Sequence, residues 1–382
     1  MPLRSVHVVG AGPVGLLLTA LLQPVEEFSV RLYEKRSEYT RTRMVRLASY
    51  LVADSVDGYR ADHLDGENVD AVFDPEELQE GLAFRQSIPA DLTALMRRWA
   101  QGFVPLNSIE RSISDLIDAR ESHPVERIDG SLTAQDAIAM VEPGDVLIDC
   151  TGSRSLLRDH LAPENTLNFL FEYALVITFL YSQTYVCNEL CKYYKNVENA
   201  HYKFIPMVHR VSHDGSVSHV TGIVTISPEE YEAMPKAFDG AWLRDNFPEV
   251  AQSMDRFIDK VKQESQGEVV GDLEILRIPL NLYRARHVTG HQRGAPVFLA
   301  GDSAIGSPYF QSISLGFECA MFLAGLISQG DAAPEDMLDH YERYIYKQWL
   351  RMYMQSKMIK NNKDLFQSLD DPTALLGKLH IY

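Results

Sequence analysis

From Val6 to Gly15 the chain reads Val-His-Val-Val-Gly-Ala-Gly-Pro-Val-Gly, and the leucine-rich segment Leu16 to Leu22 follows. An apolar run that leads into Gly-x-Gly-x-x-Gly predicts a β-strand, a tight turn and a helix. Gly10 allows the tight turn, Gly12 lets the backbone approach a pyrophosphate, and Gly15 lets the helix pack on the strand. Free N–H groups at the start of that helix would face the phosphates.

A second apolar strand, Phe28 to Tyr33, ends at Glu34, nineteen residues after Gly15. A carboxylate at this place accepts the hydroxyl pair of a ribose. The alternative is a glycine-rich turn in an ordinary βαβ unit. Because the glycine spacing, the strand, the helix and the acid agree, the sequence predicts a dinucleotide site.

Composition limits the class of protein. The chain has 382 residues, 46% of them hydrophobic, and a net charge of −17. This charge argues against nucleic acid and anionic membrane surfaces as partners. The longest apolar stretch, Leu167 to Tyr181, carries Asn168 and Glu172, so we predict no membrane span. Met1 to Ser5 leads directly into the first strand, so we expect no signal peptide.

Cysteine usage points to a reducing compartment. Four cysteines in a chain of this length lack the density of a disulfide scaffold, which favours a cytoplasmic location. Cys187 and Cys191 form the only close pair, and no His/Cys pair follows at ligand spacing. We therefore predict no metal site.

Two further segments have the pattern of cofactor contacts at strand ends. A buried strand, residues 144–149, runs into Cys150-Thr-Gly152, and a second, residues 295–300, runs into Gly301-Asp302. A large bent cofactor such as FAD touches several strand ends, which a nicotinamide dehydrogenase rarely needs. FAD is therefore favoured over NAD. Arg43 and Arg111 follow the first unit, and an arginine fork pairs well with phosphate; the alternative is two exposed charges.

The expected fold class is α/β. It comprises a Rossmann-like FAD-binding domain of the glutathione-reductase type, an inserted β-sheet substrate domain and a C-terminal helix. The FAD-binding domain is predicted to be discontinuous. The predicted divisions are residues 1–60, 95–162 and 285–332 for FAD binding, 61–94 for a polar surface excursion, 163–284 for the substrate sheet, and 333–382 for a helical tail whose aromatic residues pack rather than stack on bases.

The order of these motifs resembles the FAD-dependent single-component aromatic hydroxylases, which have a para-hydroxybenzoate-hydroxylase-like fold. The resemblance covers most of residues 1–330. It implies that FAD and its phosphates contact Gly10, Gly12, Pro13, Val14, Gly15, Glu34, Lys35, Arg36, Arg43, Arg111, Gly152, Gly301, Asp302, Pro308, Leu315 and Gly316. Within this group, Glu34-Lys-Arg, residues 43–47 and residues 193–204 lean towards MICAL-type monooxygenase domains.

Three departures from the family pattern concern flavin handling. Thr151 stands where the family usually has Asp before Gly, and Ile305 stands where its Gly-Asp motif usually ends in His. The flavin loop, residues 311–314, contains no glycine, so its backbone approaches an isoalloxazine ring less freely. The way in which the flavin is reduced is thus left open.

The resemblance implies an FAD-dependent monooxygenase in secondary metabolism, which uses NAD(P)H and O₂ to hydroxylate or epoxidise a small aromatic or polyketide-like substrate. Tyr309, Phe310, Arg43 and His209 are the candidate catalytic residues. The alternatives are a flavin-dependent reductase, dehydrogenase or cyclase without oxygen insertion, and a non-catalytic flavin protein that acts through a partner. A homodimer is compatible with the sequence.

Overall fold

The structure is a computed structural model that describes residues 4–61, 72–182, 207–211, 216–265, 267–308, 312–329 and 333–370. The chain divides into two compact units. Unit 1 comprises residues 1–41, 45–169 and 282–355, and unit 2 comprises residues 42–44, 170–281 and 356–382. Each unit is considered by itself.

Unit 1 is a mixed α/β unit. Its elements, in chain order, are β1 (Arg4–Val9), α1 (Pro13–Leu22), β2 (Phe28–Glu34), η1 (Ser49–Val52), α2 (Val56–Ala61), α4 (Pro75–Gln86), α5 (Ala90–Ala100), β4 (Val104–Pro105), α6 (Leu106–Asp118), β5 (Glu126–Asp129), α7 (Ala134–Ala139), β6 (Val146–Asp149), α8 (Arg158–Leu161), β12 (Thr289–Gln292), β13 (Ala295–Leu299), η3 (Gly301–Ser303), β14 (Ile305–Gly306) and α13 (Ser312–Ser328). Four elements contribute to both units: β3 (Met44–Val45), β7 (Leu167–Tyr181), β11 (Val269–Arg284) and α14 (Pro334–Asp370).

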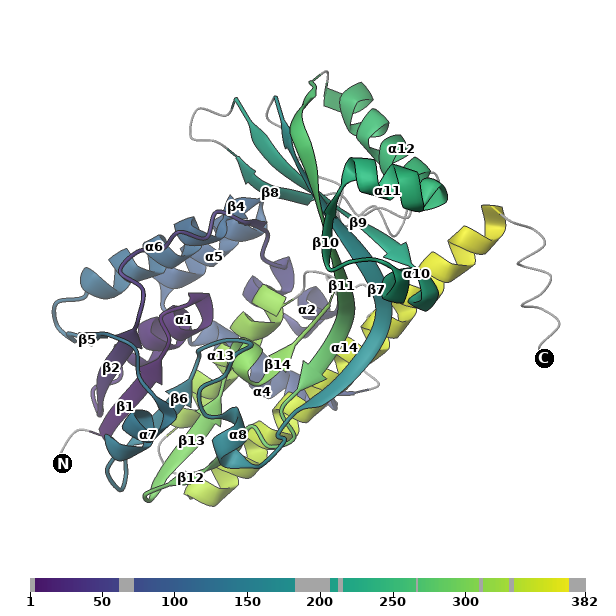
Figure 1. Ribbon diagram of the computed structural model, residues 1–382. Coiled ribbons are helices and arrows are strands. Elements are labelled where there is room, and N and C mark those ends of the chain that lie inside the picture. The colour runs from purple at the N-terminus through teal and green to yellow at the C-terminus, as the bar shows by residue number, and fades with distance from the viewer. Residues whose placement is uncertain are drawn as a thin grey trace. The chain divides into compact units, whose positions relative to one another are not determined.

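A sheet with strand order β12-β13-β6-β1-β2-β5 forms the centre of unit 1 (Figure 1). β13, β6, β1, β2 and β5 are parallel, whereas β12 is antiparallel to β13. The parallel strands read as continuous apolar runs because both faces are covered. Val6, Val8, Ile148 and Val297 are completely buried, for example. The predicted dinucleotide-binding architecture is confirmed at the level of the fold.

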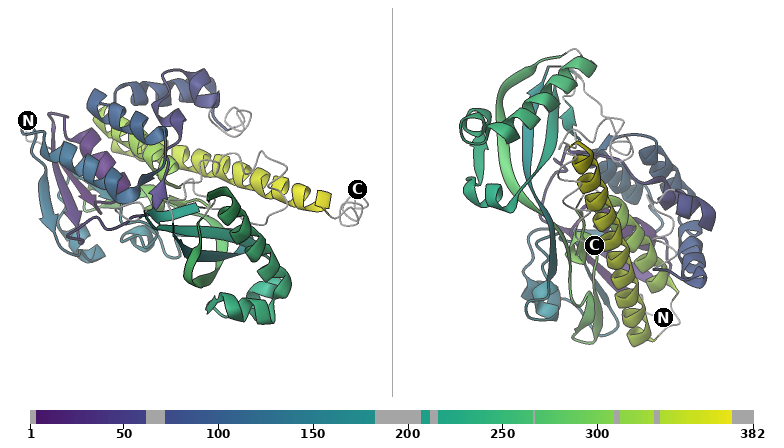
Figure 2. Two further views of the ribbon diagram at one scale, coloured as in Figure 1. Left: turned by 90° about the horizontal axis from the view of Figure 1, so that it is seen from above. Right: turned by 90° about the vertical axis from the view of Figure 1, so that its right-hand side faces the viewer.

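Helices α1, α6 and α13 pack around this sheet, and α1 contacts both of the others. The long helix α14, 37 residues in length, begins within unit 1 (Figure 2). Tyr341 of α14 is completely buried and donates a hydrogen bond to the Leu299 carbonyl of β13 at 3.0 Å. The first part of the predicted tail is therefore core, so a chain that ended near residue 330 would lose part of unit 1 rather than a separate interaction arm.

A buried charge cluster joins three helices of unit 1. Arg351 of α14 is 1% exposed and donates to Glu318 Oε2 of α13 at 2.8 Å. The Tyr59 hydroxyl of α2 donates to the other Glu318 oxygen. Burial raises the pKa of the Tyr59 hydroxyl well above its ordinary value, so it stays a donor. No sequence pattern predicted this cluster.

His7 of β1 is completely buried. Its ring lies between the Tyr33 hydroxyl, 3.0 Å from Nδ1, and Asp145 Oδ2, 3.3 Å from Nε2. Burial lowers the pKa of His7, and the hydrogen bond with Asp145 opposes this only in part. The folded protein therefore holds His7 neutral at a pH where the unfolded chain already takes up a proton.

The free energy of unfolding is therefore expected to be highest above about pH 6.5 and to fall as the pH is lowered, by up to about 1.4 kcal/mol per pH unit from this group. Urea unfolding at pH 7.5 and 5.5 measures the effect, with His7→Gln as the comparison. The His7→Gln variant should lose less stability between these two pH values than the parent chain does. An equal loss in both proteins would show that His7 does not titrate with folding.

Unit 2 is built on an antiparallel sheet, which confirms the predicted second, β-rich part of the fold. Its order is β10-β11-β7-β9-β8. β14 pairs with the end of β11 that belongs to unit 1, at Tyr283 and Arg284. The elements confined to unit 2 are β8 (Met207–Val211), β9 (Ser218–Ile226), α10 (Pro228–Ala233), β10 (Ala237–Asp239), α11 (Gly240–Asn246) and α12 (Pro248–Ser265). Alternate residues of β7, such as Leu175, Ile177 and Phe179, meet Met254 of α12 in one core.

The sequence pattern predicts one helix over residues 241–263, and this prediction is wrong in one respect: the structure has two helices, α11 and α12. Phe247, between them, has φ −137° and ψ 67°. Pro248 disfavours the helical conformation for the residue before it and has no N–H to donate, so the helix restarts there.

The described part of the predicted excursion, residues 72–94, contains α4 and the start of α5. Asp74 and Glu77 form a capping box at the start of α4. Leu78, Leu82 and Phe84 of α4 are buried, so this segment contributes to the core of unit 1 as well as to its surface. The domain divisions themselves remain a prediction.

Candidate cofactor site

The three motifs that lie far apart in the sequence follow adjacent strands of one sheet. β1 leads to Gly10, β6 to Cys150, and β13 to Gly301, and these strands are parallel neighbours in the order β13-β6-β1. Backbone hydrogen bonds continue the register past the strand ends, from Cys150 N–H to the Val9 carbonyl at 2.8 Å and from Ala300 N–H to the Asp149 carbonyl at 2.9 Å. The carboxyl ends of parallel strands meet at one edge, where α/β folds bind their ligands.

Gly10 and Gly15 are required by close packing. Gly10 has φ +101°, and a Cβ there would lie 2.7 Å from the Cys150 carbonyl oxygen. A Cβ at position 15 would lie 1.9 Å from the Gly10 carbonyl oxygen. No side chain fits at either place, which is the role that the sequence motif predicts for both glycines.

Gly12 differs because the space beside it is open to a ligand. It is the N-cap of α1, no side chain caps the helix, Pro13 follows, and the first turn has no acidic residue. A Cβ at Gly12 would meet only Nη2 of Arg41, at 3.4 Å. Free N–H groups, an open backbone and one guanidinium suit a pyrophosphate.

Val14 connects the first loop to the motif after β13. A Cβ at Gly316 of α13 would lie 2.8 Å from Val14 Cγ2, and a Cβ at Gly301 would lie 3.0 Å from it. Gly301 also has φ +61°. The structure thus brings Val14, Gly301 and Gly316 together, as the predicted set of cofactor residues requires. Pro308 and Leu315 are buried close by in the chain.

Glu34 lies at the end of β2, beside the first loop. Its Oε2 accepts a hydrogen bond from Ala11 N–H at 2.9 Å, and Arg36 donates to both of its oxygens from the side chain. Burial acts to raise the pKa of Glu34, but the hydrogen bonds from Arg36 and Ala11 outweigh it and lower that pKa. The carboxylate is therefore ionised at neutral pH, as an acceptor for ribose hydroxyls must be.

Arg41 is the cation at the open side of the loop, and it is not among the cofactor residues that the sequence predicts. Arg41 pairs with Glu110 of α6, whose side chain is fully buried. Glu110 Oε1 lies 3.8 Å from Nη2 of Arg36, whereas its Oε2 is buried without a hydrogen-bond partner. The pair therefore holds a guanidinium beside Gly12 and leaves one carboxylate oxygen unsatisfied. The available signal was an arginine two residues before the predicted Arg43.

Three further cations were predicted as cofactor contacts. Arg111 is exposed and donates to the Tyr39 carbonyl at 3.3 Å, and Lys35 is exposed. Arg43 is half-buried in the segment Thr42–Met44, which belongs to unit 2. A cofactor role for these three residues remains a prediction.

Asp149, which the sequence analysis did not single out, organises the turn after β6. Its fully buried carboxylate accepts hydrogen bonds from Thr151 N–H at 2.8 Å, Ser155 Oγ at 2.7 Å and Leu157 N–H at 2.8 Å. Gly152 N–H donates to Ser303 Oγ at 3.0 Å. This last bond ties the turn after β6 to the turn after β13.

The backbone of Asp302 is fixed from two sides. Arg158 Nη2 and the Tyr283 hydroxyl each donate to the Asp302 carbonyl oxygen at 2.9 Å. Burial, followed by the charge of Asp302, raises the pKa of Tyr283 to about 12, so the phenol remains a donor at neutral pH. The Asp302 side chain, which is half-buried, is held at the edge of the sheet.

A catalytic role for Tyr309, Phe310, Arg43 and His209 remains a prediction. Tyr309, Phe310 and residues 193–204 lie outside the described residues, and so does the pair Cys187 and Cys191; of His209 only the backbone, in β8, is described. Two other aromatic residues of the sheet have structural contacts. Tyr181 is buried and its hydroxyl accepts the Gly267 N–H at 2.6 Å, while Tyr173 stacks on Tyr231 with 4.2 Å between ring centroids.

Within the described ranges, no group of three or more His, Cys, Asp or Glu side chains is placed to hold a metal ion. No helix in the part of the chain that the structure describes is both long and apolar enough to cross a membrane.

No family model matches the sequence, and neither does any curated protein. Solved structures do match. CabE, an aromatic hydroxylase from angucycline biosynthesis, aligns over 98% of this chain and 73% of its own, with 14% identity and a TM-score of 0.54. HpxO of Klebsiella pneumoniae, solved with FAD and uric acid, aligns over 98% and 91%, with 15% identity and a TM-score of 0.51. The Diels-Alderase PyrE3 from pyrroindomycin biosynthesis aligns over 98% and 77%, with 15% identity and a TM-score of 0.51. The chain therefore has the fold of the FAD-dependent aromatic hydroxylases and their relatives.

Proposed function

We propose that this chain is an FAD-dependent monooxygenase that uses NAD(P)H and O₂ to hydroxylate or epoxidise a small organic substrate. The observation that carries the proposal is the meeting of Gly10, Cys150 and Gly301 at the carboxyl ends of three adjacent parallel strands. A nucleotide held only by the first loop would not need the other two strand ends. CabE is named an aromatic hydroxylase and HpxO was solved with FAD and uric acid, which supports the same function.

The residues present fit FAD. Gly12 and the uncapped start of α1 would take the pyrophosphate, with Arg41 as its counter-charge. Glu34 would accept the ribose hydroxyls, and Asp302 would face the ribityl chain. When bound, FAD supplies the redox chemistry that links NAD(P)H to O₂. The protein's part is to orient the substrate and to exclude water.

The first test is an absorbance spectrum of the purified protein, recorded without oxygen before and after NADPH is added. The proposal expects bound flavin that bleaches with NADPH, and oxygen uptake that rises with a substrate in a screen of small aromatic compounds. Purified protein that neither holds nor binds FAD would overturn it.

Glu34→Gln is expected to raise the dissociation constant for FAD by roughly ten- to a hundredfold, because hydrogen bonds to a charged acceptor contribute about 1.5 to 3 kcal/mol. Quenching of flavin fluorescence in a titration with protein measures the constant. Glu126→Gln is the matched control, since Glu126 pairs with Arg31 at 2.8 Å with more than half of its side chain exposed. Equal affinity in Glu34→Gln and the parent protein would remove Glu34 from the site.

A cyclase is the second candidate, and one comparison favours it. PyrE3 shares this fold and is named a Diels-Alderase, and this chain lacks glycine in residues 311–314. A cyclase of this kind would bind FAD without using NADPH or O₂ in turnover. Bound flavin that stays oxidised with NADPH under every substrate tested would favour the cyclase.

A further inference from the structure

Arg85 of α4 is a buried cation that forms no ion pair with any residue that the structure describes. The residue is 8% exposed, and its Nε is buried without a hydrogen-bond acceptor. Among the described residues, no ion pair and no hydrogen bond reaches its guanidinium. The face of the Tyr59 ring lies against it, 4.4 Å from ring centroid to guanidinium carbon, and the charge of Arg85 also acts to lower the pKa of the Tyr344 hydroxyl. An aromatic face offsets only part of the cost of burying a charge, so the environment favours an anion.

Arg85 lines a hollow of about 210 Å³ between η1, α4 and α5, together with Arg97 of α5. Arg97 is exposed and makes no ion pair with any described residue. Asp54 also lines the hollow, but it is exposed and pairs with neither arginine. In a chain with a net charge of −17, two arginines that form no ion pair with any described residue therefore line one small hollow.

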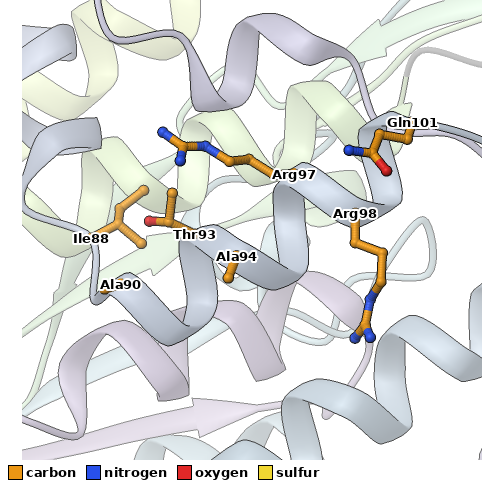
Figure 3. A pocket seen from close by; sticks show the side chains of 7 residues that line it. All are labelled: Ile88, Ala90, Thr93, Ala94, Arg97, Arg98 and Gln101. Atoms are coloured by element: carbon orange, nitrogen blue, oxygen red, sulfur yellow. The ribbon is translucent and has the colours of Figure 1, made fainter.

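A larger hollow of about 620 Å³ continues from it along α5 and shares Ile88, Thr93 and Arg97 with the first. Figure 3 shows the Arg97 side chain extending towards Thr93 and Ile88, while Arg98 leaves the helix in another direction. Ala90 and Ala94 also line the larger hollow, and their small side chains leave space along α5. The arrangement suits a molecule with an anionic group at one end and a body along α5.

We propose that the Arg85–Arg97 hollow binds the oxyanion, phosphate or carboxylate, of a small organic ligand. Arginine presents a planar set of donors that matches both groups. A hollow of about 210 Å³ admits a phosphate or carboxylate with a few further heavy atoms. The site does not depend on the proposed flavin chemistry, so its failure and that of the monooxygenase proposal are separate.

The experiment is a titration of the full-length protein with inorganic phosphate at constant ionic strength, with the thermal unfolding midpoint as the readout. The midpoint is expected to rise and to saturate. Arg97→Met should raise the phosphate concentration at half-saturation about tenfold or more, because it removes charge-assisted hydrogen bonds. Arg98→Met is the matched control: Arg98 lines the larger hollow but not the smaller one, where inorganic phosphate is expected to bind, so the titration should be unchanged.

Arg85→Met separates binding from a structural role. If Arg85 serves an anion, the variant should have a higher unfolding midpoint than the parent in phosphate-free buffer, because a buried unpaired cation is gone, and phosphate should no longer raise it. A lower midpoint would indicate that Arg85 merely packs on Tyr59. If that variant does not fold, the comparison of Arg97→Met with Arg98→Met still decides.

The source of the oxyanion is distinguished by competition. NADPH that displaces phosphate where NADH does not would identify the 2′-phosphate of the nucleotide, whereas displacement by malonate but not by NADPH would identify a carboxylate metabolite. The proposal is overturned if neither phosphate nor malonate gives a saturable shift, or if Arg97→Met and Arg98→Met respond alike.

Discussion

The Gly15→Ala variant is expected to lose about 3 kcal/mol or more of its free energy of unfolding and, with the loop displaced, its capacity to bind FAD. The added Cβ would lie 1.9 Å from the Gly10 carbonyl oxygen and 3.1 Å from Cys150 Cβ. The first of these atoms is backbone at the end of β1, so no side-chain rotation relieves the overlap. Either α1 moves away from the sheet or the turn opens.

Gly12→Ala is the control in the same loop. Its Cβ would meet only the end of the flexible Arg41 side chain, at 3.4 Å. The variant should unfold within about 1 kcal/mol of the parent, since Ala in place of Gly at an N-cap has a modest cost. It should nevertheless bind FAD more weakly, because the Cβ stands where a pyrophosphate must approach the backbone.

Urea unfolding gives the stabilities, and the flavin absorbance that remains after gel filtration gives the cofactor content. The pattern expected is loss of both properties in Gly15→Ala and loss of cofactor alone in Gly12→Ala. If Gly15→Ala unfolded like the parent chain, the close approach of α1 to the Gly10 carbonyl would be wrong.

Arg351→Met is expected to cost about 3 to 5 kcal/mol of unfolding free energy. Arg351 and Glu318 are 1% and 2% exposed, and their nearest nitrogen and oxygen atoms are 2.8 Å apart. Removing the guanidinium leaves the Glu318 carboxylate buried, with the Tyr59 hydroxyl as a neutral donor. The cost is thus the burial of an unpaired charge more than the loss of one bond.

Two comparisons separate the cost of burying an unpaired charge from the loss of the ion pair itself. The double variant Glu318→Leu/Arg351→Met should recover most of the lost stability, because apolar side chains of similar volume replace both charges. Arg244→Met removes an ion pair of similar length, 2.7 Å to Asp255, whose side chains are 49% and 42% exposed. That variant should change stability by about 1 kcal/mol or less. Equal losses in Arg244→Met and Arg351→Met would contradict a cost that arises from burial.

Much of the fold could be predicted because its signals are local. The strand before Gly10, the leucine-rich helix after Gly15, the acid at the end of β2 and the apolar run of β13 each depend on residues within about ten positions of one another. The strand ends could be recognised one by one from Gly-Asp and Thr-Gly. Their adjacency on β13, β6 and β1 was inferred from the size of a cofactor rather than from the residues themselves.

The contact of Arg41, which the sequence did not distinguish from Arg43, with Gly12 shows where local signals end. Both arginines follow the second strand, and nothing in their spacing distinguishes them. The Asn107 N–H at the start of α6 donates to the Arg41 carbonyl at 2.8 Å, and Glu110 of the same helix pairs with its guanidinium. A helix more than 60 residues later in the chain therefore selects the arginine that stands beside Gly12.

The sequence by itself determined the strands and helices around the first loop and the positions there that require glycine. It could do so because hydrophobic periodicity and the absence of a Cβ act over one helical turn or one strand. The tertiary structure decided which charges meet: Arg41 pairs with Glu110 and Arg351 with Glu318, whereas Arg85 forms no ion pair with a described residue. Ion pairs form between side chains on different elements, and their strength depends on burial, which exists only once those elements have packed.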